Sequence, residues 1–254
     1  MVVEFNNHPI SLKIMVNRKT ALKIRQTHRY LGLFIGIQFI MWTVSGLYFS
    51  WTNIDEIHGD QFRKTEMVQS NFSDLGSPSE FNPETEIHSV ELKDIAGQPY
   101  YWINQKTLQN ARTGVVKKNL SKDEAIAIAN QHMIEGLKVT DVEKITTTGD
   151  HHEYRSGPLP AYVISYDTPE DIRAYVSIAD GTFITLRHRD WRWFDFLWMT
   201  HTMDYEGRDN FNNLILRSFS VLGLITVLSG FLLWYTSSPT IRKLTKKKKK
   251  KKNI

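Results

Sequence analysis

Two long apolar stretches constrain this chain more than any other feature. Residues 30–51 contain no charged side chain, and residues 214–235 contain only Arg217, near their start. A helix of about 22 residues is about 33 Å long, which is enough to cross a hydrocarbon core of about 30 Å. Near the end of a span, a long cationic side chain such as Arg217 can reach back to the interface. The sequence therefore predicts two transmembrane helices, residues 30–51 and residues 214–235.

Charged residues are distributed unequally around these stretches. Residues 1–29 contain six Lys or Arg and one acid, and residues 236–254 contain nine Lys or Arg and no acid. Residues 52–213 contain 26 Asp or Glu against 16 Lys or Arg. Because loops rich in Lys and Arg stay on the cytoplasmic side, this pattern predicts a cytoplasmic basic N-terminus and a cytoplasmic Lys-rich tail. We expect a protein of the bacterial inner membrane whose central domain is periplasmic or extracellular.

Several classes of function are disfavoured by the same sequence. The basic residues lie beside the two spans, so the lipid bilayer is their expected partner and no nucleic acid is expected. No small-residue cleavage pattern follows the first span, so we expect it to remain as an anchor. The chain contains no cysteine, which excludes disulfides, thiolate metal sites and a cysteine nucleophile. No motif for a serine hydrolase, a zinc protease or a nucleotide site occurs either.

The central region begins with a predicted helical extension and linker, residues 52–86, of which residues 70–86 are rich in Ser, Asn, Pro and Gly. The folded domain is predicted at residues 87–190. Its clearest local signal is a capping box, Ser121 and Glu124, before an apolar run, which predicts a helix from Ser121 to about Glu135 ended by Gly136.

Four β-rich runs follow this helix, at residues 139–147, 161–167, 172–178 and 182–187, with a two-residue hairpin turn predicted at Asp180-Gly181. The expected fold class is therefore α+β and membrane-anchored, with a helix packed on an antiparallel sheet in residues 119–188. Residues 87–118 repeat the strand and turn order more weakly, which indicates a duplication.

Three segments carry a resemblance to known families. Leu-Ser-Lys-Asp-Glu-Ala-Ile-Ala-Ile-Ala at residues 120–129 and Ala-Tyr-Val-Ser-Ile-Ala-Asp-Gly at residues 174–181 resemble the PepSY domain. Arg-Gln-Thr-His-Arg-Tyr-Leu-Gly-Leu at residues 25–33 is similar to the PepSY-associated transmembrane family, although Tyr30 stands where that family usually has Trp. Two spans around one outer domain match the shorter members of that family, whereas its larger members have four or more spans.

Histidines are the candidate ligands in a chain of nine histidines and no cysteine, because a neutral imidazole ligates haem iron. His28 matches the histidine of the family and lies just before the first span; alternatively it is an interfacial residue that contacts headgroups. His201 lies in a predicted aromatic interfacial helix and turn, residues 191–213, on one helical face with Phe194, Leu197, Trp198 and Tyr205. Such a helix can also lie at the interface without any ligand.

Three further histidines are weaker candidates. His58 follows the first span and is a third candidate haem ligand on the outer side, although its surroundings are typical of a solvated helix end. His151 and His152 lie in a polar loop and are a candidate metal site without a third ligand at a recognisable spacing. His88, His132 and His188 are predicted to be surface residues.

The resemblance implies a haem-associated electron-transfer or reductase accessory in iron (siderophore) uptake, because some larger members reduce ferric siderophores through haem b. As an enzyme it would be a membrane oxidoreductase of the ferric-siderophore reductase type, working with an outer-membrane iron receptor system. His28 and His201 are expected on opposite sides of the bilayer, so each haem requires a homodimer or another membrane protein. The alternative is a tethered, non-catalytic module that binds or inhibits an extracytoplasmic protease or another protein.

Overall fold

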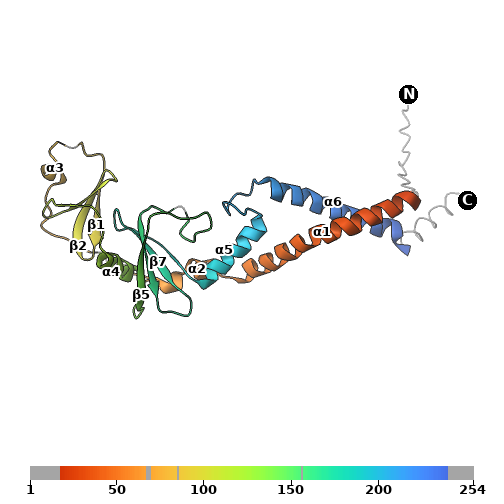
Figure 1. Cartoon of the computed structure of the whole chain (residues 1–254), viewed down its shortest axis with the longest axis horizontal. Helices are drawn as coiled ribbons and strands as arrows, with labels where there is room; N and C mark the ends of the chain where they lie inside the picture. Colours follow the sequence, from red (N-terminus) through yellow and green to blue (C-terminus); the bar gives the residue numbers. More distant parts are fainter. Residues whose placement is uncertain (1–17, 67–69, 85, 156, 240–254) are drawn as a thin grey trace, which may run out of the picture. The chain divides into compact units, whose positions relative to one another are not determined.

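The computed structural model describes residues 18–66, 70–84, 86–155 and 157–239. Within these ranges the fold is α+β, with six α-helices and two four-stranded antiparallel sheets (Figure 1). The helices are α1 (Arg18–Trp51), α2 (Ile54–His58), α3 (Pro78–Phe81), α4 (Lys122–His132), α5 (Arg189–Thr202) and α6 (Leu214–Ser237), with one 3-10 turn, η1 (Asp60–Phe62). The strands are β1 (Val90–Ile95), β2 (Gln98–Ile103), β3 (Thr107–Asn110), β4 (Val116–Lys117), β5 (Val139–Ile145), β6 (Ala161–Tyr166), β7 (Arg173–Ser177) and β8 (Phe183–Arg187).

The chain divides into two compact units. One consists of residues 45–210 and is called the sheet unit below; the other combines residues 1–44 and 211–254 and is called the helix-pair unit. Residues 1–17 of the predicted basic N-terminus and residues 240–254 of the predicted Lys-rich tail lie outside the described residues.

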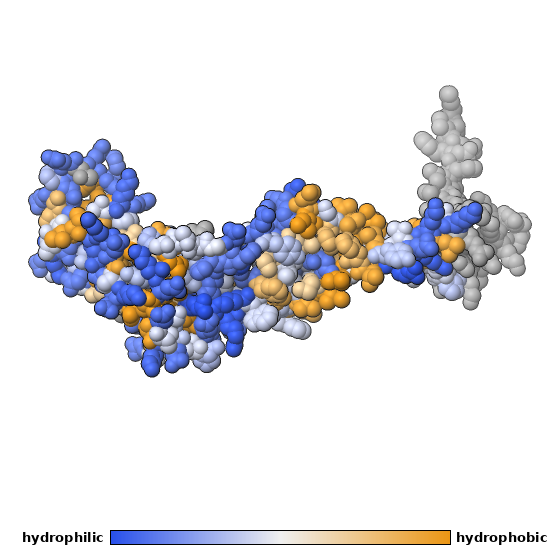
Figure 2. Space-filling view, viewed as in Figure 1, coloured by the Kyte–Doolittle hydropathy of each residue, from blue (hydrophilic) through white to orange (hydrophobic). Residues whose placement is uncertain are grey.

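Helices α1 and α6 are both long and apolar enough to cross a membrane. The helix α1 includes the predicted span, residues 30–51, and also the residues from Arg18 onward, because no Pro or Gly interrupts residues 18–29. Large apolar side chains remain uncovered on both helices, including Leu33 at 74% and Phe231 at 64% exposure, and Figure 2 shows the hydrophobic surface over these helices. A surface of this kind needs lipid or protein to cover it.

Helices α1 and α6 pack antiparallel in the helix-pair unit. The rings of Phe34 and Phe219 lie 5.5 Å apart, and a Cβ at Gly223 would lie 3.1 Å from the ring of Phe39. Gly32 and Gly36 of α1 do not form this contact, because no described atom beyond the neighbouring backbone of α1 lies within 4 Å of a Cβ placed at either residue. Close approach is therefore provided by glycine on α6.

The first sheet of the sheet unit has the strand order β1-β2-β3-β4. The segment predicted to be a linker packs against it. The backbone N–H of Gly76 donates to the carbonyl of Ala111 (2.8 Å), and the hydroxyl of Tyr101 donates to the carbonyl of Gly76 (3.0 Å). The ring of Phe81, in α3, covers Gly114, where a Cβ would lie 2.7 Å away. Residues that resemble a linker in composition thus form part of a folded layer.

The helix α4 begins as predicted, with both hydrogen bonds of the capping box between Ser121 and Glu124. Its end was predicted too late. The helix stops at His132 because the next residue, Met133, pairs with Arg63 as an isolated antiparallel bridge, and Ile134 donates to the carbonyl of Phe62. Gly136, at φ +86°, belongs to the following turn rather than to the helix cap.

The main hydrophobic core of the sheet unit is centred on α4. Its buried face, Ala125, Ile128 and Ala129, belongs to one cluster with buried residues of both sheets, including Ile95 from β1 and Ile164 from β6. The second sheet, in the order β5-β6-β7-β8, is the predicted antiparallel sheet. The helix-on-sheet prediction is therefore correct, and the same helix also covers the first sheet.

Two local predictions need correction. The hairpin between β7 and β8 turns through Asp180 and Gly181, but the loop is wider than two residues, since the N–H of Ser177 donates to the carbonyl of Thr182. His188 is not a surface residue: it is 1% exposed and its Nε2 lies 3.0 Å from the carbonyl oxygen of Ile57. His188 follows the end of β8 and packs against α2. No local sequence pattern indicates this contact.

Candidate functional site

His28 lies at the contact between α1 and α6. Its Nδ1 is 2.7 Å from the hydroxyl oxygen of Ser229, and that hydroxyl donates its own hydrogen to the carbonyl of Thr226, also at 2.7 Å. A hydroxyl has one hydrogen, so when Ser229 donates to Thr226 its oxygen accepts from His28, in the tautomer that carries a hydrogen on Nδ1. In that tautomer Nε2 of His28 keeps its lone pair, which is the form that ligates a metal.

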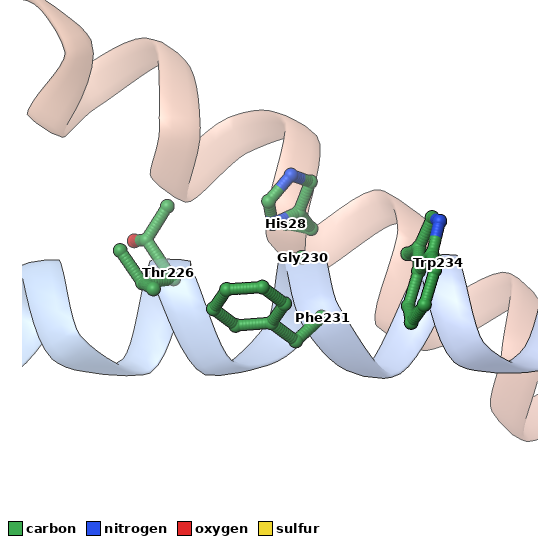
Figure 3. A pocket seen from close by; sticks show the side chains of 6 residues that line it. His28, Thr226, Gly230, Phe231 and Trp234 are labelled. Atoms are coloured by element: carbon green, nitrogen blue, oxygen red, sulfur yellow. The ribbon is translucent and has the colours of Figure 1, made fainter.

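The ring of His28 borders an open pocket of about 510 Å³. The pocket is lined by His28, Thr226, Val227, Gly230, Phe231 and Trp234. Figure 3 shows His28 above Gly230, with the rings of Phe231 and Trp234 on the same helix. A Cβ at residue 230 would lie 3.2 Å from Cε1 of His28, so glycine leaves room for the imidazole. Apart from His28 and Thr226, the walls are aromatic or apolar, as expected for an apolar cofactor.

His201 has a similar partner in the sheet unit. Its Nδ1 lies 2.7 Å from the hydroxyl of Ser45, a residue that is fully buried. The ring of Phe49 lies edge-on to His201 at 5.6 Å and also contacts Phe194 (4.9 Å) and Trp198 (5.7 Å). Burial lowers the pKa of His201, which favours the neutral imidazole needed for ligation.

The predicted aromatic face of the 191–213 segment is only partly correct. Phe194, Trp198 and His201 do share one side of α5, where they meet Phe49. Tyr205 is not on that face, because α5 ends at Thr202 and the next residue, Met203, has a φ of +52°. The opposite side of α5 is buried as well, through Trp191 and Asp195. The helix is therefore packed on two sides within the sheet unit.

The weaker candidates are exposed or hydrogen-bonded within their own loop. His58, the last residue of α2, is exposed. His151 is exposed, and Nδ1 of His152 accepts from the N–H of Tyr154 at 3.1 Å. Across residues 18–239, apart from the few that are not described, no group of three or more His, Asp or Glu is placed to hold a metal ion. The structure thus brings no third ligand to the loop pair.

Sequence reasoning missed the two serines that contact the histidines. Both occur before a glycine in similar sequences, Thr-Val-Ser-Gly at residues 43–46 and Thr-Val-Leu-Ser-Gly at residues 226–230. In sequence alone, small residues of this kind indicate close packing between membrane helices. The signal was present, but the pairing of each serine with a histidine on another helix depends on the tertiary structure.

Comparisons with known proteins identify no relative of this chain. The chain matches no protein-family model, no curated protein and no solved structure. The fold places this chain among α+β proteins, with two helices that are long and apolar enough to cross a membrane.

Proposed function

We propose that this chain is an inner-membrane protein that binds haem b through His28 and His201 and serves electron transfer in iron uptake, as a reductase or its accessory. The observation that carries the proposal is the placement of His28. Its Nδ1 lies 2.7 Å from the hydroxyl of Ser229, and its ring borders a mainly apolar pocket. In haem and metal sites the second ring nitrogen of a ligating histidine is commonly fixed in this way.

The residues of the pocket fit an apolar macrocycle. Phe231 and Trp234 offer aromatic surface, and Gly230 keeps the space beside the imidazole open. His28 is the one titratable side chain among the described residues that line it. A bis-imidazole haem needs a second histidine, which a second copy of the chain would supply across the uncovered apolar face of α6.

Within this proposal the protein fixes the ligand rather than performing the redox step. Haem b held by two imidazoles supplies reversible one-electron transfer. The hydroxyl of Ser229 accepts the hydrogen bond from Nδ1 of His28, so Nε2 is the nitrogen left for the iron. Ser45 lies at the same distance from Nδ1 of His201, and the ring of Phe49 contacts that imidazole edge-on.

The localisation can be tested with reporter fusions. We expect alkaline phosphatase fused after Gly114 to be active, because residues 52–213 are acidic and both flanking ends are basic. A fusion at the C-terminus should be inactive for the same reason. An inactive fusion at Gly114 together with an active one at the C-terminus would reverse the proposed orientation.

The haem proposal predicts the colour of the purified protein. Full-length protein extracted in detergent from haem-supplemented cells should show a Soret band and, after reduction, a sharp α-band, because bis-imidazole ligation gives low-spin haem. His28→Ala and His201→Ala should each lose part of the absorbance, and the double variant all of it. The exposed His88 provides the control, and His88→Ala should keep the full spectrum.

A second pair of variants tests the role given to Ser229. Ser229→Ala leaves Nδ1 of His28 without its acceptor, so we expect a shift in the midpoint potential of the haem on that side. Ser220→Ala, on the same helix, removes a hydroxyl that only caps the carbonyl of Leu216 and should leave the potential unchanged. Colourless wild-type protein after haem supplementation would refute the electron-transfer proposal.

One observation favours the tethered binding module as the second candidate function. The edge strand β1 pairs with β2 alone among the described strands, and its Val90 and Leu92 are 42% and 45% exposed. An extended peptide can add to such an edge. This candidate predicts colourless protein that retains a partner through β1, and Leu92→Lys should release that partner.

A further inference from the structure

A polar pocket in the sheet unit is not used by the proposed electron transfer. It has a volume of about 350 Å³ and lies among the loop around residue 152, the strand β7 and the helix α5. Its apolar wall is formed by Trp191, Phe196 and Met199. Histidine and arginine side chains form the rest, together with two carboxylates. The pocket is therefore amphipathic, with one apolar side and one charged side.

Each of the two carboxylates is shared between two arginines. Glu153 contacts Arg192 at 2.5 Å and Arg173 at 3.3 Å, and it accepts a hydrogen bond from the hydroxyl of Tyr175. Asp195 contacts both Arg155 and Arg208. The side chains of Glu153 and Asp195 are only 11% and 8% exposed, so these charges interact in a poorly solvated region.

Positive charge exceeds negative charge in this cluster. Asp171 and Asp209 also contact its arginines, but their side chains are 54% and 74% exposed and their charges are screened by water. Arg187 lies 4.0 Å from the ring of Trp191 and has no carboxylate within 4.0 Å in the described part of the chain. The arrangement therefore retains an uncompensated guanidinium charge beside the pocket.

Arg208 gives a second, independent indication of a ligand. Arg208 is 8% exposed and lines the pocket. Its Nε is buried and has no hydrogen-bond partner among the described residues. The backbone of Arg208 has a φ of +69°, and Arg155 and Asp171 are also in the left-handed region, at +58° and +49°. Non-glycine residues adopt this conformation at an energetic cost.

We propose that this pocket binds a small organic carboxylate, whose charged group contacts the arginines and whose apolar part lies against Trp191 and Phe196. Guanidinium groups bind carboxylates through paired hydrogen bonds, and a carboxylate would balance the excess charge. The volume suits a compact molecule, since ligand pockets begin at about 300 Å³. The proposal is independent of haem.

The test uses benzoate as the probe and full-length protein in detergent. Calorimetric titration should give saturable binding of benzoate with one site per chain. Benzamide, which has nearly the same shape without the charge, should bind at least about tenfold more weakly. Benzoate should also raise the thermal unfolding temperature, because it binds the folded state alone. Inorganic phosphate serves as the second anion, because it has charge but no apolar part.

Matched variants on α5 locate the site. Arg192→Gln should weaken benzoate binding about tenfold or more, whereas Arg189→Gln, at an exposed arginine of the same helix, should not change it. Phe196→Ala removes apolar wall outside the ion pairs and should weaken benzoate but not phosphate, which keeps the test valid if Arg192→Gln fails to fold. The proposal is overturned if benzoate shows no saturable binding up to about 10 mM. It is also overturned if benzamide binds as tightly as benzoate, or if Arg192→Gln and Phe196→Ala both bind benzoate with unchanged affinity.

Discussion

Replacing Ile128 with alanine is expected to lower the free energy of unfolding of the sheet unit by about 3 kcal/mol. Ile128 is 2% exposed and belongs to the core that joins α4 to both sheets. Alanine removes apolar contacts and leaves a cavity, because the sheets on either side cannot both collapse onto the helix. A loss of this size is a large fraction of the stability of a typical domain.

The measurement is denaturant unfolding followed by circular dichroism, with Ile126→Ala as the control. Ile126 lies on the same helix but is only partly buried, so the same change should cost about 1 kcal/mol. Equal losses for the two variants would mean that Ile128 does not connect the two sheets.

Replacing Glu153 with glutamine is expected to destabilise the sheet unit by about 3 kcal/mol at neutral pH, because it leaves two arginines without their shared carboxylate. Burial alone would raise the pKa of Glu153, but hydrogen bonds from Arg192 and Tyr175 and the charges of Arg192 and Arg173 outweigh it and hold the pKa below 4.5. A carboxylate whose pKa is lower in the folded state stabilises the protein above its unfolded pKa. That contribution is lost as pH falls through the lowered folded pKa.

The difference in stability between wild type and Glu153→Gln should therefore be constant above about pH 5.5 and shrink as pH falls below 4.5, the ordinary value for Glu. Urea unfolding at neutral pH and at about pH 3 measures it. Glu143→Gln is the control, because Glu143 is exposed on β5 and should show little change at either pH. A difference that does not change with pH would show that the carboxylate of Glu153 contributes no charge interaction.

Much of the architecture follows from patterns that are local in sequence. The apolar stretches predicted α1 and α6, because a helix long enough to cross a bilayer must be apolar over its whole length. The capping box at Ser121 and Glu124 predicted the start of α4, since both hydrogen bonds join residues three apart. The alternating runs after it predicted the second sheet.

Tertiary structure decided where local patterns end. Nothing near His132 in the sequence indicates the end of α4, because the bridge from Met133 reaches back to Arg63. The segment before Ile87 has the composition of a linker, yet Phe81 in it packs over Gly114. Boundaries of this kind depend on contacts between distant residues, which the order of residue types does not encode locally.

The candidate sites divide in the same way. The sequence by itself determined that the chain has histidines and no cysteine, and that His28 lies beside an apolar helix. Only the tertiary structure set Ser229 against His28 and Ser45 against His201, and only it gathered the arginines around Glu153 and Asp195. The physical reason is that a hydrogen bond or ion pair fixes the state of a side chain only once folding brings its two partners within a few ångströms.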